Sequence, residues 1–226
     1  MKNLIRKKLV ESRYGEEQQI NKADYPRIKI LINLVGSYKR ILDIGCYQGY
    51  IGKLALDCNN EVYGIDLASK AVSLARQKGI RAFELDIETE HLPFEENFFD
   101  AVIAAEIIEH IFDTDAFLEK IKRVLKPDGS LILSTPNLAA LGRRLMLLFG
   151  KNPLTEVSLG NEAAGHIRYF VKESIFNLLK SHGFKIEFFT SDVINFNNRG
   201  NLFLSWPAKI FPTIGKSLII KARNNK

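Results

Sequence analysis

The sequence predicts an α/β fold with a doubly wound, mostly parallel β-sheet and helices on both faces. Three observations support this prediction. From residue 40 onward, apolar runs of strand length alternate with segments of helix length. The runs are nearly continuous in apolar residues, which is typical of strands covered on both faces. The first run ends in a glycine-punctuated turn, Asp43-Ile44-Gly45-Cys46-Tyr47-Gln48-Gly49, that leads directly into a new helical period.

Local signals set the ends of the elements. Asp24 before a proline is expected to cap the helix over 25–35. Ser69 is expected to cap the helix after the second strand and Gly79 to end it, while Asp113 or Thr114 begins the helix after the fourth strand. The expected helices cover 4–20, 25–35, 50–56, 69–77, 114–124, 138–148 and 171–181, and the strands 40–44, 61–67, 81–87, 100–105, 130–137, 184–190 and 217–222, with a turn over 125–129.

Length and composition narrow the possible classes of protein. The 226 residues are 46% hydrophobic and 26% charged, which suits one globular domain over 1–226. Two cysteines, Cys46 and Cys58, are too few for a disulfide framework, so a reducing, cytoplasmic location is expected. The basic start lacks the apolar core of a signal peptide. The net charge of +6 is dispersed along the chain, which argues against a dedicated nucleic-acid surface.

Acidic residues are expected at the carboxyl ends of two strands. Asp66 stands about 20 residues beyond the glycine turn, where a carboxylate can accept both hydroxyls of a ribose. Asp86 ends the third strand, with a local turn cap as the alternative role. Gly45 and Gly49 permit positive φ, and N–H groups opening the next helix can receive polar ligand groups. Ligands of such sheets collect outside the carboxyl strand ends, so one cleft should gather these residues.

The glycine turn does not fit the dinucleotide fingerprint G-x-G-x-x-G, because Tyr47 and Tyr50 stand at the second and third glycines. It resembles D-x-G-x-G-x-G instead, with Asp43, Gly45 and Gly49 in place and Tyr47 at the middle glycine. That pattern is motif I of the class I S-adenosylmethionine-dependent methyltransferases. The segment from Pro93 to Ala105 resembles the L-P-F-x-x-x-x-F-D-x-V segment of the same family, and the match extends over four strands in the right order.

The resemblance implies a Rossmann-like sheet of seven strands, with the last strand antiparallel. It implies S-adenosylmethionine as the cofactor and S-adenosylhomocysteine as the product, with Asp86 and Ile87 holding the adenine. Helices over 1–37 would cover the cofactor cleft, and insertions over 138–165 and 195–215 would form the lid or the acceptor side. The implied cofactor-binding residues are Asp43, Gly45, Cys46, Gly49, Asp66, Leu67, Asp86, Ile87 and Ala105.

The catalytic candidates follow the fourth strand. Glu106, Glu109 and His110 are three and four residues apart, so one helical turn can bring them together. His110 is the first candidate for a base, because its ordinary pKa lies near neutrality, and Glu109 would orient it. The alternative is local ion pairing, with His110 packed against isoleucines. With the downstream His166, the pattern E-x-x-E-H also resembles the metal site of small-RNA 3′-end methyltransferases and O-methyltransferases of the ubiquinone pathway, so a divalent ion stays open.

These observations predict methyl transfer to an oxygen or nitrogen of a small or lipid-linked acceptor. The apolar segments over 138–148 and 202–214 favour a greasy acceptor and peripheral contact with a membrane. The amphipathic segment over 138–148 has a second interpretation as a peripheral core helix. RNA methylation, a nicotinamide-dependent oxidoreductase and a non-catalytic S-adenosylmethionine-binding module are the competing functions. The sequence leaves the acceptor and the oligomeric state open.

Overall fold

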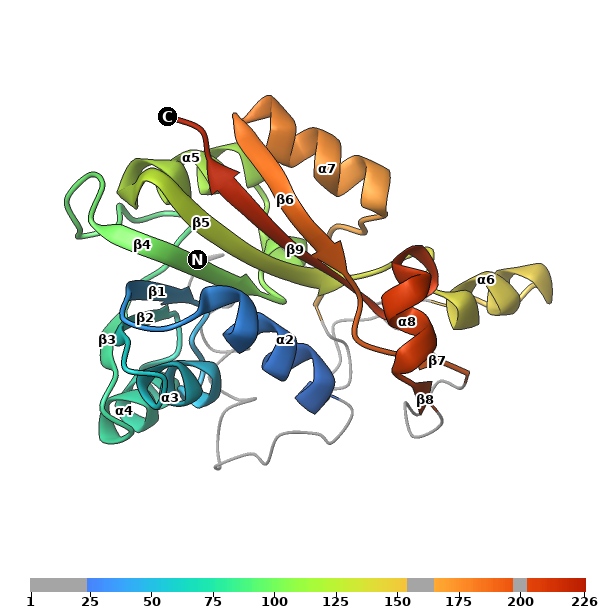
Figure 1. Ribbon diagram of the computed structural model, residues 1–226, viewed down its shortest axis with the longest axis horizontal. Helices are drawn as coiled ribbons and strands as arrows, with labels where there is room; N and C mark the ends of the chain where they lie inside the picture. Colours follow the sequence, from blue (N-terminus) through green and yellow to red (C-terminus); the bar gives the residue numbers. More distant parts are fainter. Residues whose placement is uncertain (1–23, 154–164, 197–202) are drawn as a thin grey trace.

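The protein is described by a computed structural model that covers residues 24–153, 165–196 and 203–226 (Figure 1). The expected helix over 4–20 and parts of the two predicted insertions lie outside the described residues. The strands are β1 Arg40–Ile44, β2 Glu61–Asp66, β3 Arg81–Glu84, β4 Phe99–Ala105, β5 Leu125–Pro136, β6 Phe184–Thr190, β7 Ile194–Asn195, β8 Phe203–Leu204 and β9 Ser217–Asn224. The helices are α2 Tyr25–Val35, α3 Tyr50–Leu56, α4 Ser69–Gln77, α5 Thr114–Val124, α6 Leu141–Leu148, α7 Lys172–Ser181 and α8 Trp206–Ile210, with 3-10 turns η2 Ile108–His110 and η3 Pro212–Ile214.

The centre of the molecule is a seven-stranded sheet with the strand order β3-β2-β1-β4-β5-β9-β6. Strands β1 to β5 are parallel to one another, and β9 is antiparallel to both β5 and β6. This topology confirms the predicted sheet with its antiparallel last strand. The chain order reverses between β1 and β4, and in such sheets ligands bind at that switch point.

Helices cover both faces of the sheet. Alternate residues of each strand point to opposite sides, so each strand contributes to a core on each face. In β4, Val102 and Ala104 contact a core that includes buried residues of α5 and α7. Their neighbours Ala101 and Ile103 contact a second core with residues of α2, α3 and α4. The helices lie on the two sides accordingly (Figure 1). Each fully buried valine or isoleucine side chain contributes about 1.5–3 kcal/mol to the stability of the fold.

Two of the predicted helix caps were wrong. Asp24 precedes α2, but its side chain makes no capping hydrogen bond; its Oδ1 lies 3.5 Å from Arg27 and 3.1 Å from Lys216. The carboxylate therefore pairs with these two cations and not with an N–H group at the start of the helix. Ala68 rather than Ser69 precedes α4, whose start has no side-chain cap. Asp113 caps α5 as predicted, since it accepts a hydrogen bond from the Ala116 N–H.

Several predicted boundaries also shift. The predicted turn over 125–129 belongs to β5, yet its pairing with β4 jumps from Phe99–Leu125 to Ala101–Ser130. Residues 126–129 therefore form a bulge between these two pairs. β2 and β3 end earlier than predicted, which places Leu67 and Asp86 in the loops after them. Helix α6 begins at 141 and buries none of its residues, so the interpretation as a core helix was wrong.

Candidate active site

The glycine turn after β1 is closed by its own backbone. The N–H groups of Gly45 and Cys46 both donate to the Ile65 carbonyl at 2.9 and 3.0 Å, and that of Gly49 donates to the Cys46 carbonyl. Gly45 has φ +70°, and a Cβ there would lie 3.0 Å from Cδ1 of Ile107. These amides therefore shape the turn rather than face a ligand. The close approach to Ile107 brings the turns after β1 and β4 together at the switch point.

Two buried carboxylates lie beside this turn. Asp66 accepts hydrogen bonds from the N–H groups of Tyr47 and Ala68, each at 2.9 Å and each at a different oxygen. Every carboxylate oxygen has a second lone pair, so two hydroxyl groups can still be bound. Asp43 is 2% exposed, and within the described chain its Oδ2 has no hydrogen-bond partner. Burial and the nearby Asp66 raise the pKa of Asp43 to about 7.

A lysine of helix α5 holds the loop that follows β3. Asp86 Oδ1 accepts a hydrogen bond from the Glu88 N–H at 3.0 Å, so the residue caps a turn, as the alternative proposed. The Lys120 ammonium donates to the carbonyls of Ile87, Glu88 and Glu90 at 2.6, 3.1 and 2.9 Å. Sequence reasoning missed this role, because nothing in a helical pattern distinguishes a lysine that binds carbonyls from one that faces solvent.

The turn after β4 carries a buried acid. Glu106 has φ +54°, a left-handed conformation that is rare for a residue with a side chain. Glu109 is 1% exposed; its Oε2 accepts a hydrogen bond from Thr135, and its Oε1 lies 3.9 Å from Nε2 of His166. Burial, followed by the charge of Glu106, raises the pKa of Glu109 to about 8. A carboxyl group with this pKa can hold or release a proton near neutral pH.

His166 reaches this turn because its segment docks on Glu109. The N–H groups of Ile167 and Arg168 both donate to the Glu109 carbonyl, at 3.0 and 3.1 Å. His110 Nδ1 lies 3.1 Å from the Gly165 carbonyl, which can only accept, so Nδ1 carries the hydrogen and Nε2 is the ring's acceptor atom. The structure thus brings Glu109, His110 and His166 together, with one potential ligand atom from each within 4.8 Å of the others.

Glu106 stands apart from that cluster and belongs to a contact with α2. Its Oε1 accepts a hydrogen bond from Ser134 at 2.9 Å and lies 3.5 Å from Nη1 of Arg27. The same Nη1 lies 3.4 Å from the Ser134 hydroxyl, and Arg27 Nε is buried without a hydrogen bond in the described part of the chain. Sequence reasoning missed Arg27, because a single arginine in a helix gives no sign of which tertiary partner it meets.

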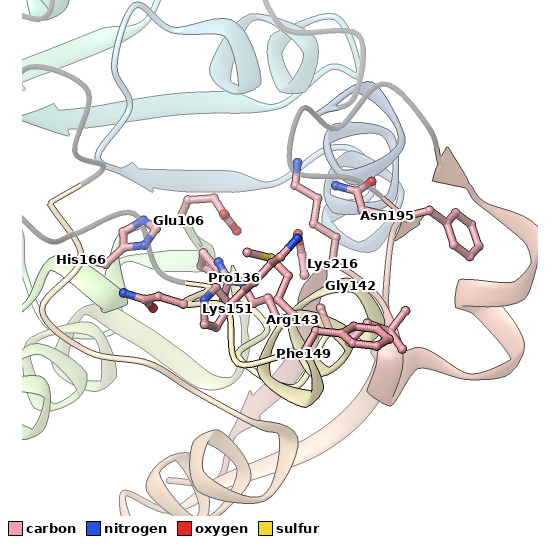
Figure 2. A pocket seen from close by; sticks show the side chains of 16 residues that line it. Glu106, Pro136, Gly142, Arg143, Phe149, Lys151, His166, Asn195 and Lys216 are labelled. Atoms are coloured by element: carbon pink, nitrogen blue, oxygen red, sulfur yellow. The ribbon is translucent and has the colours of Figure 1, made fainter.

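A cavity of about 490 Å³ opens beside these groups (Figure 2). Glu106 and His166 line it together with α6, the end of β5, β7 and the start of β9. The apolar side chains from α6 and its C-terminal end are Leu145, Met146 and Phe149, and the cationic ones around the cavity are Arg143, Lys151 and Lys216. The cavity therefore suits a largely apolar molecule with a polar end directed toward Glu106 and His166.

The strand order, the closed glycine turn and the acids at the end of β2 and after β3 define the class I methyltransferase fold. Residues 42–133 match the family model described as a methyltransferase domain. The chain is 30% identical to the mitochondrial ubiquinone biosynthesis O-methyltransferase of Bos taurus over 158 residues, which cover 66% of this chain and 42% of the relative. It is 36% identical to the ubiquinone biosynthesis O-methyltransferase of Xanthomonas oryzae pv. oryzae over 111 residues, 47% of this chain and 46% of the relative.

The matches therefore span less than half the length of these curated relatives. Among solved structures, the Burkholderia thailandensis 1,6-didemethyltoxoflavin-N1-methyltransferase superposes with a TM-score of 0.68 at 18% identity, covering 99% of this chain and 88% of that one. That protein was solved with 1,6-didemethyltoxoflavin and S-adenosylhomocysteine bound. The fold, the matched methyltransferase domain and these relatives support a class I S-adenosylmethionine-dependent methyltransferase, and both curated relatives are O-methyltransferases of ubiquinone biosynthesis, in agreement with the sequence prediction.

Proposed function

We propose that the protein transfers the methyl group of S-adenosylmethionine to an oxygen or nitrogen of a small or lipid-linked acceptor. The observation that carries the proposal is the cluster of Glu109, His110 and His166, of which His166 lines the cavity. The names of the relatives favour an oxygen acceptor. The apolar lining from α6 favours an acceptor with a substantial hydrocarbon part.

The residues at the switch point fit this cofactor. Asp66 has two oxygens that can accept the ribose hydroxyls, and Asp86 and Ile87, in the loop after β3, would hold the adenine. The buried Oδ2 of Asp43, which has no hydrogen-bond partner among the residues that the structure describes, is suited to a ligand that brings positive charge, as a sulfonium and an ammonium group do. The guanidinium of Arg27 can receive a carboxylate. Gly45, Cys46, Gly49, Leu67 and Ala105 would form the walls.

The cofactor supplies a methyl group that is already electrophilic, so the chain's task is to align the acceptor, exclude water and remove a proton. His110 presents Nε2 as its acceptor atom, because Nδ1 donates to Gly165. It therefore serves as the base for an acceptor hydroxyl. In its ionised form Glu109 stabilises the positive charge that His110 gains, and its Oε1 lies 3.9 Å from Nε2 of His166. Glu106 lines the cavity together with His166.

A divalent cation is a second way to activate the hydroxyl. Glu109, His110 and His166 offer the carboxylate and imidazole ligands that transition metals accept. With a cation bound, the three side chains would act as its ligands, and the cation would polarise the acceptor hydroxyl so that water, instead of His110, could accept its proton. Treatment with a chelator separates the two possibilities, since base catalysis survives it and metal catalysis does not.

The first test is calorimetric titration with S-adenosylhomocysteine and, separately, with NADH. We expect binding of the first ligand alone and its loss in Asp66→Ala, while Asp57→Ala on the surface serves as the matched control. Binding of NADH instead, or of neither ligand, would refute the proposal.

The second test measures S-adenosylhomocysteine formation with a series of phenols and amines of increasing hydrocarbon length. His110→Ala should abolish turnover while retaining cofactor affinity, and His182→Ala, far along α7, should change neither. Cofactor binding without turnover on any acceptor would favour the non-catalytic module. A preference for RNA with a strongly salt-dependent affinity would favour the RNA alternative.

A further inference from the structure

Two segments at one end of the molecule expose an unusual amount of apolar surface. Helix α6 buries none of its residues, and Leu147, Leu148 and Phe149 are 58%, 75% and 73% exposed. The β8–α8 segment exposes four further large side chains, of which Trp206 is 65% exposed. Both segments project from the same end of the sheet (Figure 1). We call this the apical surface and define it by Leu147, Leu148, Phe149, Leu204, Trp206, Ile210 and Phe211.

The two segments are joined through β7. Gly142 in α6 lies so close to Asn195 of β7 that a Cβ on the glycine would stand 2.9 Å from the Asn195 carbonyl oxygen. β7 in turn pairs with β8, where Ile194 faces Leu204. The apical surface is therefore one connected structural unit rather than two independent projections.

The charged side chains within these two segments are all basic. Residues 138–153 and 203–218 contain no acidic side chain. The same residues include five basic ones, although acids are nearly as common as bases in the chain as a whole. The basic residues are Arg143, Arg144, Lys151, Lys209 and Lys216. A surface that joins exposed leucine, phenylalanine and tryptophan to lysine and arginine has the composition of elements that lie in a membrane interface.

We propose that the apical surface docks on a bilayer that contains anionic phospholipids. Leucine and phenylalanine side chains would enter the boundary between headgroups and acyl chains, tryptophan would sit at headgroup level, and Arg144 and Lys209, which do not line the cavity, would contact lipid phosphates. A second copy of the chain is a poorer occupant, because a two-fold interface would place the same positive surface against itself. No helix in the described ranges is long and apolar enough to cross a bilayer.

The cavity and the apical surface share helix α6 and its C-terminal end. Leu145, Met146 and Phe149, from α6 and its C-terminal end, line the cavity that leads to Glu106 and His166. A lipid-borne acceptor could pass from the bilayer along α6 without crossing water. This last step rests on the proposed function, whereas docking on the bilayer does not and can be measured without cofactor or acceptor.

The test is flotation of the full chain with vesicles of phosphatidylcholine, alone or with about 30% phosphatidylglycerol. We expect flotation with the anionic vesicles only, and its loss in high salt. The double variant Leu148→Ser/Trp206→Ser should bind at least about tenfold more weakly. Leu54→Ser on α3, an exposed leucine outside the surface, is the matched control and should bind like the parent chain.

A second variant tests the charge separately. Lys209→Gln should lower affinity for anionic vesicles about fivefold, since one basic residue near the membrane is worth about 1 kcal/mol. If circular dichroism shows that the double variant does not fold, the Lys209→Gln variant still tests whether the apical surface binds anionic vesicles. Absence of flotation, or equal flotation with pure phosphatidylcholine, would overturn the proposal. Concentration-dependent self-association that the double variant abolishes, without vesicle binding, would show instead an interface between copies of the chain.

Discussion

Asp43 gives the most direct test of the electrostatics at the switch point. Its side chain is almost fully buried, its Oδ2 lacks a hydrogen bond among the described residues, and Asp66 lies near enough to repel its charge. Burial and this repulsion raise the pKa of Asp43 from 3.8 to about 7. The ionised form is therefore destabilised in the folded protein relative to the unfolded chain. The substitution Asp43→Asn keeps the shape and removes the ionisation.

The sign and the size follow from linkage. Because the folded-state pKa is the higher one, the folded protein binds more protons than the unfolded chain between pH 4 and 7, so its stability falls as the pH rises through this window. A difference from 3.8 to about 7 corresponds to a loss on the order of 4 kcal/mol by pH 8. The asparagine variant lacks this loss.

The assay is urea unfolding of the parent chain and of Asp43→Asn at several pH values from 4.5 to 8. We expect the stability of the variant relative to the parent to rise by about 2–4 kcal/mol across this range, with unchanged m-values. The surface variant Asp57→Asn should give a flat difference. A flat difference for Asp43→Asn as well would refute the reasoning, because it would mean that Asp43 ionises in the folded protein as it does in water.

Three further predictions concern separate parts of the site. Arg27→Met should weaken S-adenosylhomocysteine binding about tenfold in calorimetry and leave 5′-methylthioadenosine, which lacks the carboxylate, unaffected; equal losses for both ligands would contradict a carboxylate contact. Lys120→Met frees three loop carbonyls and should raise the dissociation constant of S-adenosylhomocysteine about tenfold, with partial rescue by Lys120→Arg and no effect of Lys122→Met. Gly215→Ala places a Cβ 2.0 Å from the Ser191 hydroxyl and should cost about 1–3 kcal/mol in urea unfolding; an unchanged unfolding midpoint would contradict this close contact.

Some features of the site could not be predicted because they depend on distant partners. Arg27 meets Glu106 and Ser134 only because the sheet places α2 beside the ends of β4 and β5. The Lys120 ammonium binds the loop after β3 only because α5 packs beneath it. The predicted cap by Asp24 failed for the same reason, since a lysine 192 residues away competes for its carboxylate. Periodicity and capping rules describe neighbours in the chain and contain no information about these contacts.

The sequence alone determined the sheet, its order of elements and the acids at its strand ends. Apolar runs and amphipathic periods depend on local backbone geometry, and the family pattern from Asp43 to Gly49 fixes where a cofactor would lie. The tertiary structure decided how the chemistry is assembled. Glu109 gains its raised pKa from burial and its histidine neighbour from a segment 57 residues further on, and both follow from packing that no single stretch of sequence encodes.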